Sequence, residues 1–285
     1  IETPFGKVEK TLGGSATYAS FAASFFSKPA LISVIGNDFP KDSLELMKKR
    51  GIDLDGLKIT GKTFHWEGFY GYDMNEAKTK KTELNSLEHF KVNVPEKYKD
   101  IRYIFLANID PEHQLETLKL MNKPELIVLD TMNFWINNKK NSLLEVIKKV
   151  DVLLLNDGEA RQLFSTANLV NAANRALSLG PKAVIIKKGE HGALLFTKNK
   201  HFNAPGYPLE NIKDPTGCGD CFGGAFISYL AKTKDLSERN FRKAIIYGSV
   251  VASHNAEDFG IDRLKTLTMN DIEKRYKEFQ DMREF

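Results

Sequence analysis

The chain has only two thiols in 285 residues, Cys218 and Cys221. This scarcity excludes a disulfide framework and is typical of a reducing, cytoplasmic compartment. The chain also lacks an apolar run of the roughly 18 to 20 residues that a membrane helix requires. Its 41 basic and 37 acidic residues nearly balance, so the broad basic surface typical of nucleic-acid binding is not expected. We therefore expect neither a membrane nor a nucleic-acid partner.

The chain opens at Ile1, without a methionine and without the apolar segment of a secretory signal. We interpret this abrupt start as a sign that a segment precedes Ile1 in the natural protein.

Short apolar, β-branched runs alternate with longer helical patterns along the chain. Strands are predicted at residues 30–36, 102–108, 125–130, 151–156, 183–188 and 192–197. Helices are predicted at residues 15–27, 40–50, 111–122, 141–149, 157–165, 168–179, 219–231, 237–255 and 269–284. Strands that are hydrophobic throughout are typical of a parallel sheet with helices on both faces. The sequence therefore predicts an α/β fold with a doubly wound, mostly parallel sheet.

Residues 58–90 interrupt this alternation. The segment is rich in threonine, aromatic residues and glycine, and residues 63–72 alternate in polarity, which predicts a small inserted antiparallel sheet. Such a sheet is either an edge hairpin of the main sheet or a lid over a ligand crevice. The predicted organisation is a main domain of residues 1–57 and 91–285 with an inserted β-sheet at 58–90.

The stretch DPTGCGDCFGGAF, residues 214–226, contains both cysteines in C-x-x-C spacing. A redox site requires a thiol of lowered pKa, and a zinc site requires four ligands, which these two cysteines do not supply. A glycine turn explains more of the stretch, because Gly217 and Gly219 let the backbone approach a ligand and a following helix start favours an anion. Asp220 is then either a helix cap or a general base. No Gly-Lys-Ser/Thr follows, so the stretch is not a Walker A loop.

This stretch resembles the glycine–aspartate motif of the ribokinase-like (PfkB) carbohydrate kinase family. Other segments match that family in order: LGGSATYAS at 12–20, VIGNDFP at 34–40, LLNDGEA at 154–160 and IKKGEHGALLF at 186–196. The resemblance covers most of the chain. It implies a ribokinase-like fold, an inserted β-sheet lid, and transfer of the γ-phosphoryl group of ATP to a hydroxyl of a sugar or sugar-containing molecule.

The resemblance also implies roles for the residues near the motif. Asp220 would be the catalytic base, and the backbone amides of Gly217, Cys218 and Gly219 would form an anion hole for the transferring group. Asp214 would help to bind a monovalent cation such as K⁺, or else cap a turn.

For the nucleotide, the resemblance implies that Asn156 and Glu159 hold Mg²⁺ and phosphate through water. Helix capping is the other interpretation of Asn156. Lys187 would face the phosphates, or else be a solvated surface lysine, and Gly189 would approach the nucleotide or simply form a turn.

For the acceptor, the resemblance implies that Gly13 and Gly14 bring the backbone close to the substrate and that Asp38 contacts substrate or holds a turn. Family members commonly carry an asparagine where this chain has Tyr18, so ribose itself is not the expected acceptor. Members also begin with a strand that ends in a substrate-binding acid, and this chain shows no such strand, which again suggests that it starts late.

The lid segment supplies His65, Trp66 and Tyr70 as candidates for ligand contact, and the family resemblance implies a homodimer through the lid. Alternatives to a sugar kinase are a nucleoside (adenosine-like) kinase of the same fold, a non-catalytic sugar- or nucleotide-binding relative, and a C-x-x-C oxidoreductase. The intact glycines and Asp220 argue against a mere binding protein, which needs no base.

Overall fold

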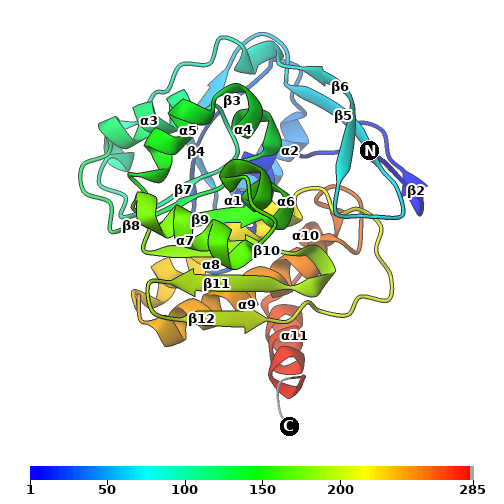
Figure 1. The fold of residues 1–285 in the computed structure, drawn as a ribbon. Helices are drawn as coiled ribbons and strands as arrows, with labels where there is room; N and C mark the ends of the chain where they lie inside the picture. The colour runs from blue at the N-terminus through cyan, green and yellow to red at the C-terminus, as the bar shows by residue number, and fades with distance from the viewer. Residues whose placement is uncertain (283–285) are drawn as a thin grey trace.

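A computed structural model describes residues 1–282 of the chain. Its central feature is a six-stranded sheet with the order β12-β11-β10-β9-β8-β7 (Figure 1). The strands are β7 (Tyr103–Leu106), β8 (Leu126–Leu129), β9 (Val152–Asn156), β10 (Ala183–Lys187), β11 (Ala193–Thr197) and β12 (His201–Ala204). Strands β7 to β10 are parallel, whereas β11 and β12 continue the sheet in antiparallel pairing.

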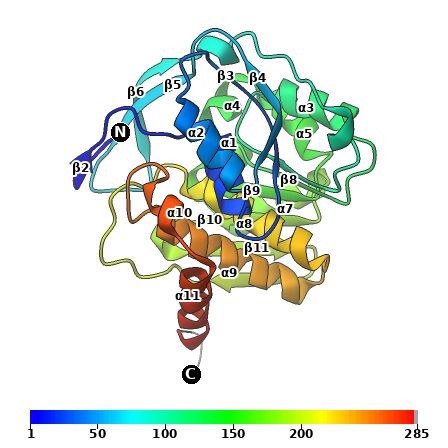
Figure 2. The same ribbon diagram turned by 180° about the vertical axis from the view of Figure 1, so that it is seen from behind.

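Helices cover both faces of this sheet, as Figures 1 and 2 show from opposite sides. One face carries α3 (Pro111–Leu120), α4 (Asn133–Asn138), α5 (Lys140–Ile147), α6 (Asp157–Phe164) and α7 (Leu169–Leu179). The other face carries α1 (Ser15–Ala23), α8 (Cys218–Thr233) and α9 (Glu238–Asn255), which pack on one another.

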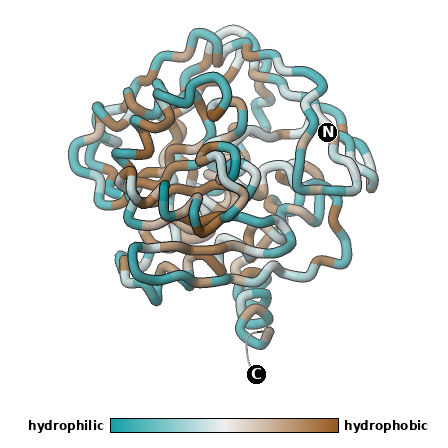
Figure 3. Tube along the Cα trace, in the orientation of Figure 1, coloured by the Kyte–Doolittle hydropathy of each residue, from teal (hydrophilic) through white to brown (hydrophobic). Residues whose placement is uncertain are grey.

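The continuous hydrophobicity of the strands follows from this double coverage. In β9, Leu154 packs with the core under α8 and α9, while Leu153 and Leu155 face the core under α5 to α7. Successive side chains of a strand point to opposite faces, so a strand buried on both faces needs apolar residues at every position. Figure 3 shows these hydrophobic residues concentrated in the centre of the molecule.

Two smaller sheets lie beside the main one. Strands β3 (Ala30–Ile35) and β4 (Asp53–Ile59) form a parallel pair, linked by α2 (Lys41–Lys49). A four-stranded sheet of order β2-β1-β5-β6 combines β1 (Glu2–Thr3) and β2 (Gly6–Lys7) with β5 (His65–Tyr70) and β6 (Ala77–Glu83). We call this four-stranded sheet the lid sheet.

The chain ends with α10 (Asp262–Thr266) and α11 (Met269–Asp281), and α11 projects away from the sheets (Figure 1). Short 3₁₀ helices lie at Asn85–Leu87, Glu96–Tyr98 and Gly189–His191. None of the helices in residues 1–282 is long and apolar enough to cross a membrane.

The predicted α/β fold and all six predicted strands are confirmed, and the nine predicted helices are present. The predicted end of the last helix at residues 283–284 lies outside the described residues. Six strands and α-helices among the described residues were not predicted: β1, β2, β4, β12, α4 and α10. Strand β4 escapes prediction because most of its side chains are partly or fully exposed. The domain boundaries at 57 and 90 stay a prediction, and the lid sheet also includes strands from residues 2–7.

Candidate active site

The predicted anion hole lies at the N-terminus of α8. Gly217 has a φ of 78°, and a Cβ there would lie 2.3 Å from the Tyr18 ring, so only glycine fits this position. Gly217 caps the helix without a side chain, and the N–H groups of a first helical turn have no partner within the helix. In this structure the Cys218 N–H donates to the Pro215 carbonyl oxygen at 3.1 Å, and the predicted role of Gly217, Cys218 and Gly219 as an anion hole rests on the preference of helix N-termini for anions.

Asp220 lies in this same first turn, and its surroundings favour the protonated carboxyl group. Its Oδ1 is buried and makes no hydrogen bond with any of the described residues. Burial raises the pKa of Asp220 to about 7, with a further contribution from the charge of Asp130, while Lys187 and a hydrogen bond from Ser15 act in the opposite direction. A carboxylate with a pKa near neutrality suits general-base catalysis. Ser15, the first residue of α1, is a neighbour that the sequence did not reveal.

Lys187 lies directly beside the anion hole. It is the last residue of β10, and its Nζ is 3.0 Å from the point where a Cβ on Gly219 would lie. The ammonium group contacts both carboxylate oxygens of Asp130, at 2.9 and 3.0 Å. Burial acts to lower the pKa of Lys187, but the charges of Asp130 and Glu159 raise it above its ordinary value. Lys187 is thus a cation held at the site, not a solvated surface lysine.

Asp130 was missed by sequence analysis. It follows β8 directly, and only 4% of its surface is exposed. The signal was present in the sequence, because an acid directly after a buried parallel strand lies at the carboxyl edge of the sheet, where ligands bind.

Asn156 and Glu159 face each other at the start of α6. The Asn156 Oδ1 accepts a hydrogen bond from the Glu159 N–H, and a Glu159 carboxylate oxygen accepts one from the Asn156 N–H, both at 2.7 Å. This capping box shows that Asn156 caps the helix. Glu159 is buried, and burial raises its pKa to about 7, with Lys187 opposing and Asp130 adding to the rise.

These buried carboxylates fit a divalent cation. A cation placed near Glu159, Asp130 and Asp220 would offset negative charge that Lys187 alone does not balance. No group of three or more His, Cys, Asp or Glu side chains in residues 1–282 is arranged to enclose a metal. Mg²⁺ keeps several waters and takes few protein ligands, so these carboxylates would hold it through water.

Asp214 is fully buried before the anion hole. One carboxylate oxygen accepts a hydrogen bond from the Thr216 N–H at 2.9 Å, and the other accepts one from the Gly260 N–H at 3.1 Å. Burial raises the pKa of Asp214. These bonds tie the loop before α8 to the loop after α9, so Asp214 does cap a turn.

On the acceptor side, Gly14 has a φ of 91° and caps α1, and a Cβ on Gly13 would touch the Tyr18 ring. Tyr18 is 1% exposed, and its hydroxyl is buried without a hydrogen-bond partner among the described residues. Its ring packs against Gly217. Asp38 is exposed and accepts hydrogen bonds from both the N–H and the hydroxyl of Thr63, each at 2.7 Å. Asp38 thus ties the loop after β3 to the loop that leads from β4 into β5.

The lid sheet contacts the two loops of the site. Thr216 donates a hydrogen bond to the Tyr70 hydroxyl at 3.1 Å, and Asn75 donates one to Glu190 at 2.9 Å. Gly189 has a φ of 54°, and a Cβ there would collide with Asn75. Gly189 therefore approaches the lid closely in this structure. His65 is exposed, and Trp66 donates a hydrogen bond to Thr79 within the lid sheet.

The two cysteines are free thiols and do not form a reactive pair. Burial raises the pKa of Cys218 to about 12 and raises that of Cys221 as well. A thiol that stays protonated is a poor nucleophile, so the geometry gives no support to the redox interpretation.

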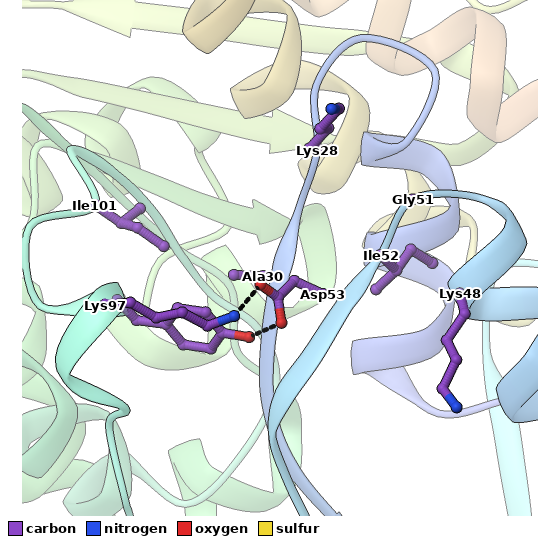
Figure 4. A pocket seen from close by; sticks show the side chains of 9 residues that line it. Lys28, Ala30, Lys48, Gly51, Ile52, Asp53, Lys97 and Ile101 are labelled. Atoms are coloured by element: carbon purple, nitrogen blue, oxygen red, sulfur yellow. Dashed lines mark hydrogen bonds and ion pairs between the residues drawn. The ribbon is translucent and has the colours of Figure 1, made fainter.

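A cavity of about 500 Å³ opens at a different place, between the start of β3 and β4 and the segment before β7 (Figure 4). Ala30 and Asp53, the first residues of β3 and β4, line it, and Asp53 accepts hydrogen bonds from Lys97 and Tyr98. The cavity thus lies at the amino ends of these strands. Ligands in open α/β sheets bind at the carboxyl ends, where Asp130, Asn156 and Lys187 converge.

The comparisons with known proteins agree with this geometry. The sequence profile of the pfkB family of carbohydrate kinases matches residues 4–265. The chain is 29% identical to the cytidine kinase of Thermococcus kodakarensis over 232 residues, which cover 79% of this chain and 82% of that protein. It is 26% identical to the nucleoside kinase of Methanocaldococcus jannaschii over 231 residues, which cover 81% of this chain and 74% of that protein.

Among solved structures, a ribokinase II candidate from Escherichia coli in complex with ATP and Mg²⁺ has a TM-score of 0.77. The two chains are 20% identical, and the match covers 95% of this chain and 90% of that one. This likeness confirms the ribokinase-like fold. Because the family profile spans nearly the whole chain, the protein belongs to the pfkB family of carbohydrate kinases and is a phosphotransferase with an alcohol group as acceptor.

Proposed function

We propose that the protein is a nucleoside kinase that transfers the γ-phosphoryl group of ATP to a ribose hydroxyl. The observation that carries the reaction is Asp220, a carboxylate of raised pKa in the first turn of α8, beside Lys187. The similarity to a cytidine kinase and a nucleoside kinase over about four fifths of the chain favours a nucleoside as acceptor. Tyr18 supports this choice, because a buried phenol does not replace the amide that sugar-kinase members use.

In the proposed reaction, Asp220 accepts the proton of the attacking hydroxyl. The N–H groups of Gly217, Cys218 and Gly219, together with Lys187, stabilise the negative charge of the transferring group. Ser15 lies close enough to Asp220 to lower its pKa and so to favour the charged form of the base. Mg²⁺, when bound, neutralises charge on the phosphates, and Glu159 with Asn156 would hold it through water. Gly13 and Gly14 lie where the acceptor approaches.

We also propose a monovalent cation such as K⁺ near Asp214, a homodimer through the lid sheet and a cytoplasmic setting. The buried Asp214 carboxylate supports the cation proposal. The two free thiols support the cytoplasmic setting. Replacing K⁺ by tetramethylammonium, which is too large for a site that holds K⁺, should lower turnover, and unchanged turnover would contradict the cation proposal.

The direct test is a coupled assay of ADP formation with Mg-ATP and a panel of acceptors: cytidine, adenosine, inosine, ribose and fructose. We expect kcat/KM for one of the nucleosides to exceed that for either free sugar by roughly tenfold or more, because the site loses contacts when the base is missing. The Asp220→Asn variant controls for contaminating kinases. A clear preference for ribose or fructose would refute the nucleoside assignment and leave a sugar kinase of the same mechanism.

A further inference from the structure

Asp130 and Lys187 form the buried ion pair closest to the anion hole. The two side chains are 6% and 16% exposed, and Lys187 Nζ is 2.9 and 3.0 Å from the two carboxylate oxygens of Asp130. They come from neighbouring regions of the sheet, at the carboxyl ends of β8 and β10. Taking both charges out of water is costly unless the geometry is held well. Because this ion pair is costly to bury, we expect it to have a functional role at this site.

Hydrogen bonds from Gln114 and to the Leu106 carbonyl fix the loop that carries Asp130. Gln114 of α3 is 2% exposed, and its side-chain amide donates hydrogen bonds to the carbonyl oxygens of Ala107 at 2.9 Å and Asp130 at 3.4 Å. The N–H of Asp130 bonds to the Leu106 carbonyl at 2.9 Å. The carboxylate thus stands on a rigid edge of the sheet, which lets it hold a flexible lysine in one place.

Lys187 has other carboxylates within reach of its charge. Glu159 and Asp220 both act on its pKa, in the same direction as Asp130. The lysine pairs with Asp130, and this leaves the Asp220 Oδ1 without a partner among the described residues. At the same time the ammonium group lies 3.0 Å from the point where a Gly219 Cβ would be. The glycine leaves room for the lysine to reach the anion hole.

We propose that Asp130 is a positioning residue that holds Lys187 against the anion hole, where the lysine contacts the γ-phosphoryl group of ATP, and that keeps Lys187 away from the base Asp220. This inference rests on the proposed phosphoryl transfer and assigns a role to a residue outside the recognised motifs. In this proposal Lys187 contacts the γ-phosphoryl group, which ATP has and ADP lacks. The lysine should therefore strengthen the binding of ATP but not that of ADP.

The test measures the dissociation constants of Mg-ATP and Mg-ADP by titration calorimetry without acceptor, for four proteins: wild type, Asp130→Asn, Lys187→Met and the double variant. We expect each single variant to lower the preference for ATP over ADP by roughly tenfold, the size of one charge-assisted hydrogen bond. The double variant should match Lys187→Met alone, because Asp130 acts through the lysine. A merely structural role would weaken both nucleotides equally and would overturn the proposal.

The matched control is Lys182→Met. Lys182 pairs with Asp151 at 2.7 Å at the opposite ends of the neighbouring strands β9 and β10, where it is exposed. Its loss should leave the nucleotide preference unchanged, as is usual for exposed ion pairs. Additive losses in the double variant would show that Asp130 acts on the nucleotide independently of Lys187, which also overturns the proposal.

Thermal unfolding checks that each variant folds. Should Asp130→Asn not fold, Asp130→Glu keeps the charge but displaces the ammonium by one methylene, and it should lower the ATP preference in the same way. An unchanged preference in that variant overturns the proposal. Because these titrations use no acceptor, a failure to phosphorylate any nucleoside would count against the proposed function while this inference is still tested.

Discussion

At the scale of single residues, the site depends on carboxylates whose charge the fold disfavours. Asp220 and Glu159 both have pKa values raised to about 7 by burial, and the single lysine among them, Lys187, is paired with Asp130. Such environments are common where acid–base chemistry occurs. The same burial makes these groups costly for folding, so each residue-scale prediction couples activity to stability.

The first prediction concerns Asp220→Asn. The amide keeps the size of the side chain but accepts no proton, so kcat should fall by at least ~10²-fold while Mg-ATP binding is preserved. The variant should also be more stable than wild type at pH 8, by about 1 to 3 kcal/mol, because a buried charge with an unpaired oxygen is removed. Steady-state kinetics, calorimetry and urea unfolding check these results. Full turnover in the variant would exclude Asp220 as the base.

The second prediction is the pH dependence of catalysis. A base works in its deprotonated form, and the pKa of Asp220 lies at about 7 rather than near 4. The acid limb of kcat/KM in the free enzyme should therefore have its midpoint near pH 7, with activity rising above it. Stability should change in the opposite sense, falling as the pH rises from about 4 to 7, because the folded state holds the proton more tightly. A flat profile between pH 5.5 and 8 would contradict the assigned base.

At the scale of secondary-structure elements, one carboxylate links the C-terminal helix α11 to α9 and α10. Glu257 lies just beyond α9 and accepts hydrogen bonds from Arg275 of α11 at 2.6 Å and from Arg263 of α10 at 3.0 Å. His254 of α9 lies 3.2 Å from the same carboxylate. Burial acts to raise the pKa of Glu257, but the hydrogen bonds from His254 and Arg275 lower it to about 2. Three helices thus meet at one acid.

The third prediction follows from this junction. Glu257→Gln should lower the free energy of unfolding at pH 7 by about 2 to 3 kcal/mol, because Arg263 and Arg275 lose their charged partner. A lowered carboxyl pKa adds stability above the unfolded value of about 4.5, and that stability is lost as the pH falls from there toward 2. Urea unfolding at pH 7 and pH 2.5 should show the difference from wild type shrinking at the lower pH.

The matched control for the junction is Asp262→Asn, which breaks the exposed pair with Lys265 in α10. It should change stability by less than about 0.5 kcal/mol. An equal loss from Glu257→Gln at both pH values would contradict the charge-based account.

At the scale of the whole molecule, the lid sheet joins the start of the chain to residues 65–83 and meets the loops around the site. Large apolar side chains are exposed around it: Phe5 is 58% exposed and Tyr72 is 90% exposed. The edge strand β6 carries three lysines and is exposed throughout, which discourages pairing of two such edges. A second copy would therefore dock on apolar side chains rather than extend the sheet.

The fourth prediction is that the protein sediments as a dimer at micromolar concentration and that Phe5→Asp with Tyr72→Asp shifts it to a monomer. Interfaces lose affinity when central aromatic residues become charged. The matched control is Val170→Asp, which changes an apolar residue that is 51% exposed on α7. A wild-type monomer would refute the dimer, and a dimer in the double variant would place the interface elsewhere.

The sequence determined the elements and the chemical motif of this protein. Apolar runs such as ELIVLD and DVLLLN predict buried strands because burial on two faces leaves a local signature. The glycines at 217 and 219 and the acid at 220 indicate an anion-binding turn with a base, since backbone freedom and charge are properties of adjacent residues. The family resemblance followed from those same local features.

Only the tertiary structure decided which distant residues meet that motif. Asp130, Ser15 and Tyr18 lie far from residue 220 in the sequence, and they reach its turn because parallel strands and packed helices bring their ends to one edge of the sheet. The lid sheet was likewise assembled from two segments about sixty residues apart, by backbone pairing that no periodicity records. The pKa of Asp220 depends on burial and on charges from other elements, so it becomes visible only once the chain has folded.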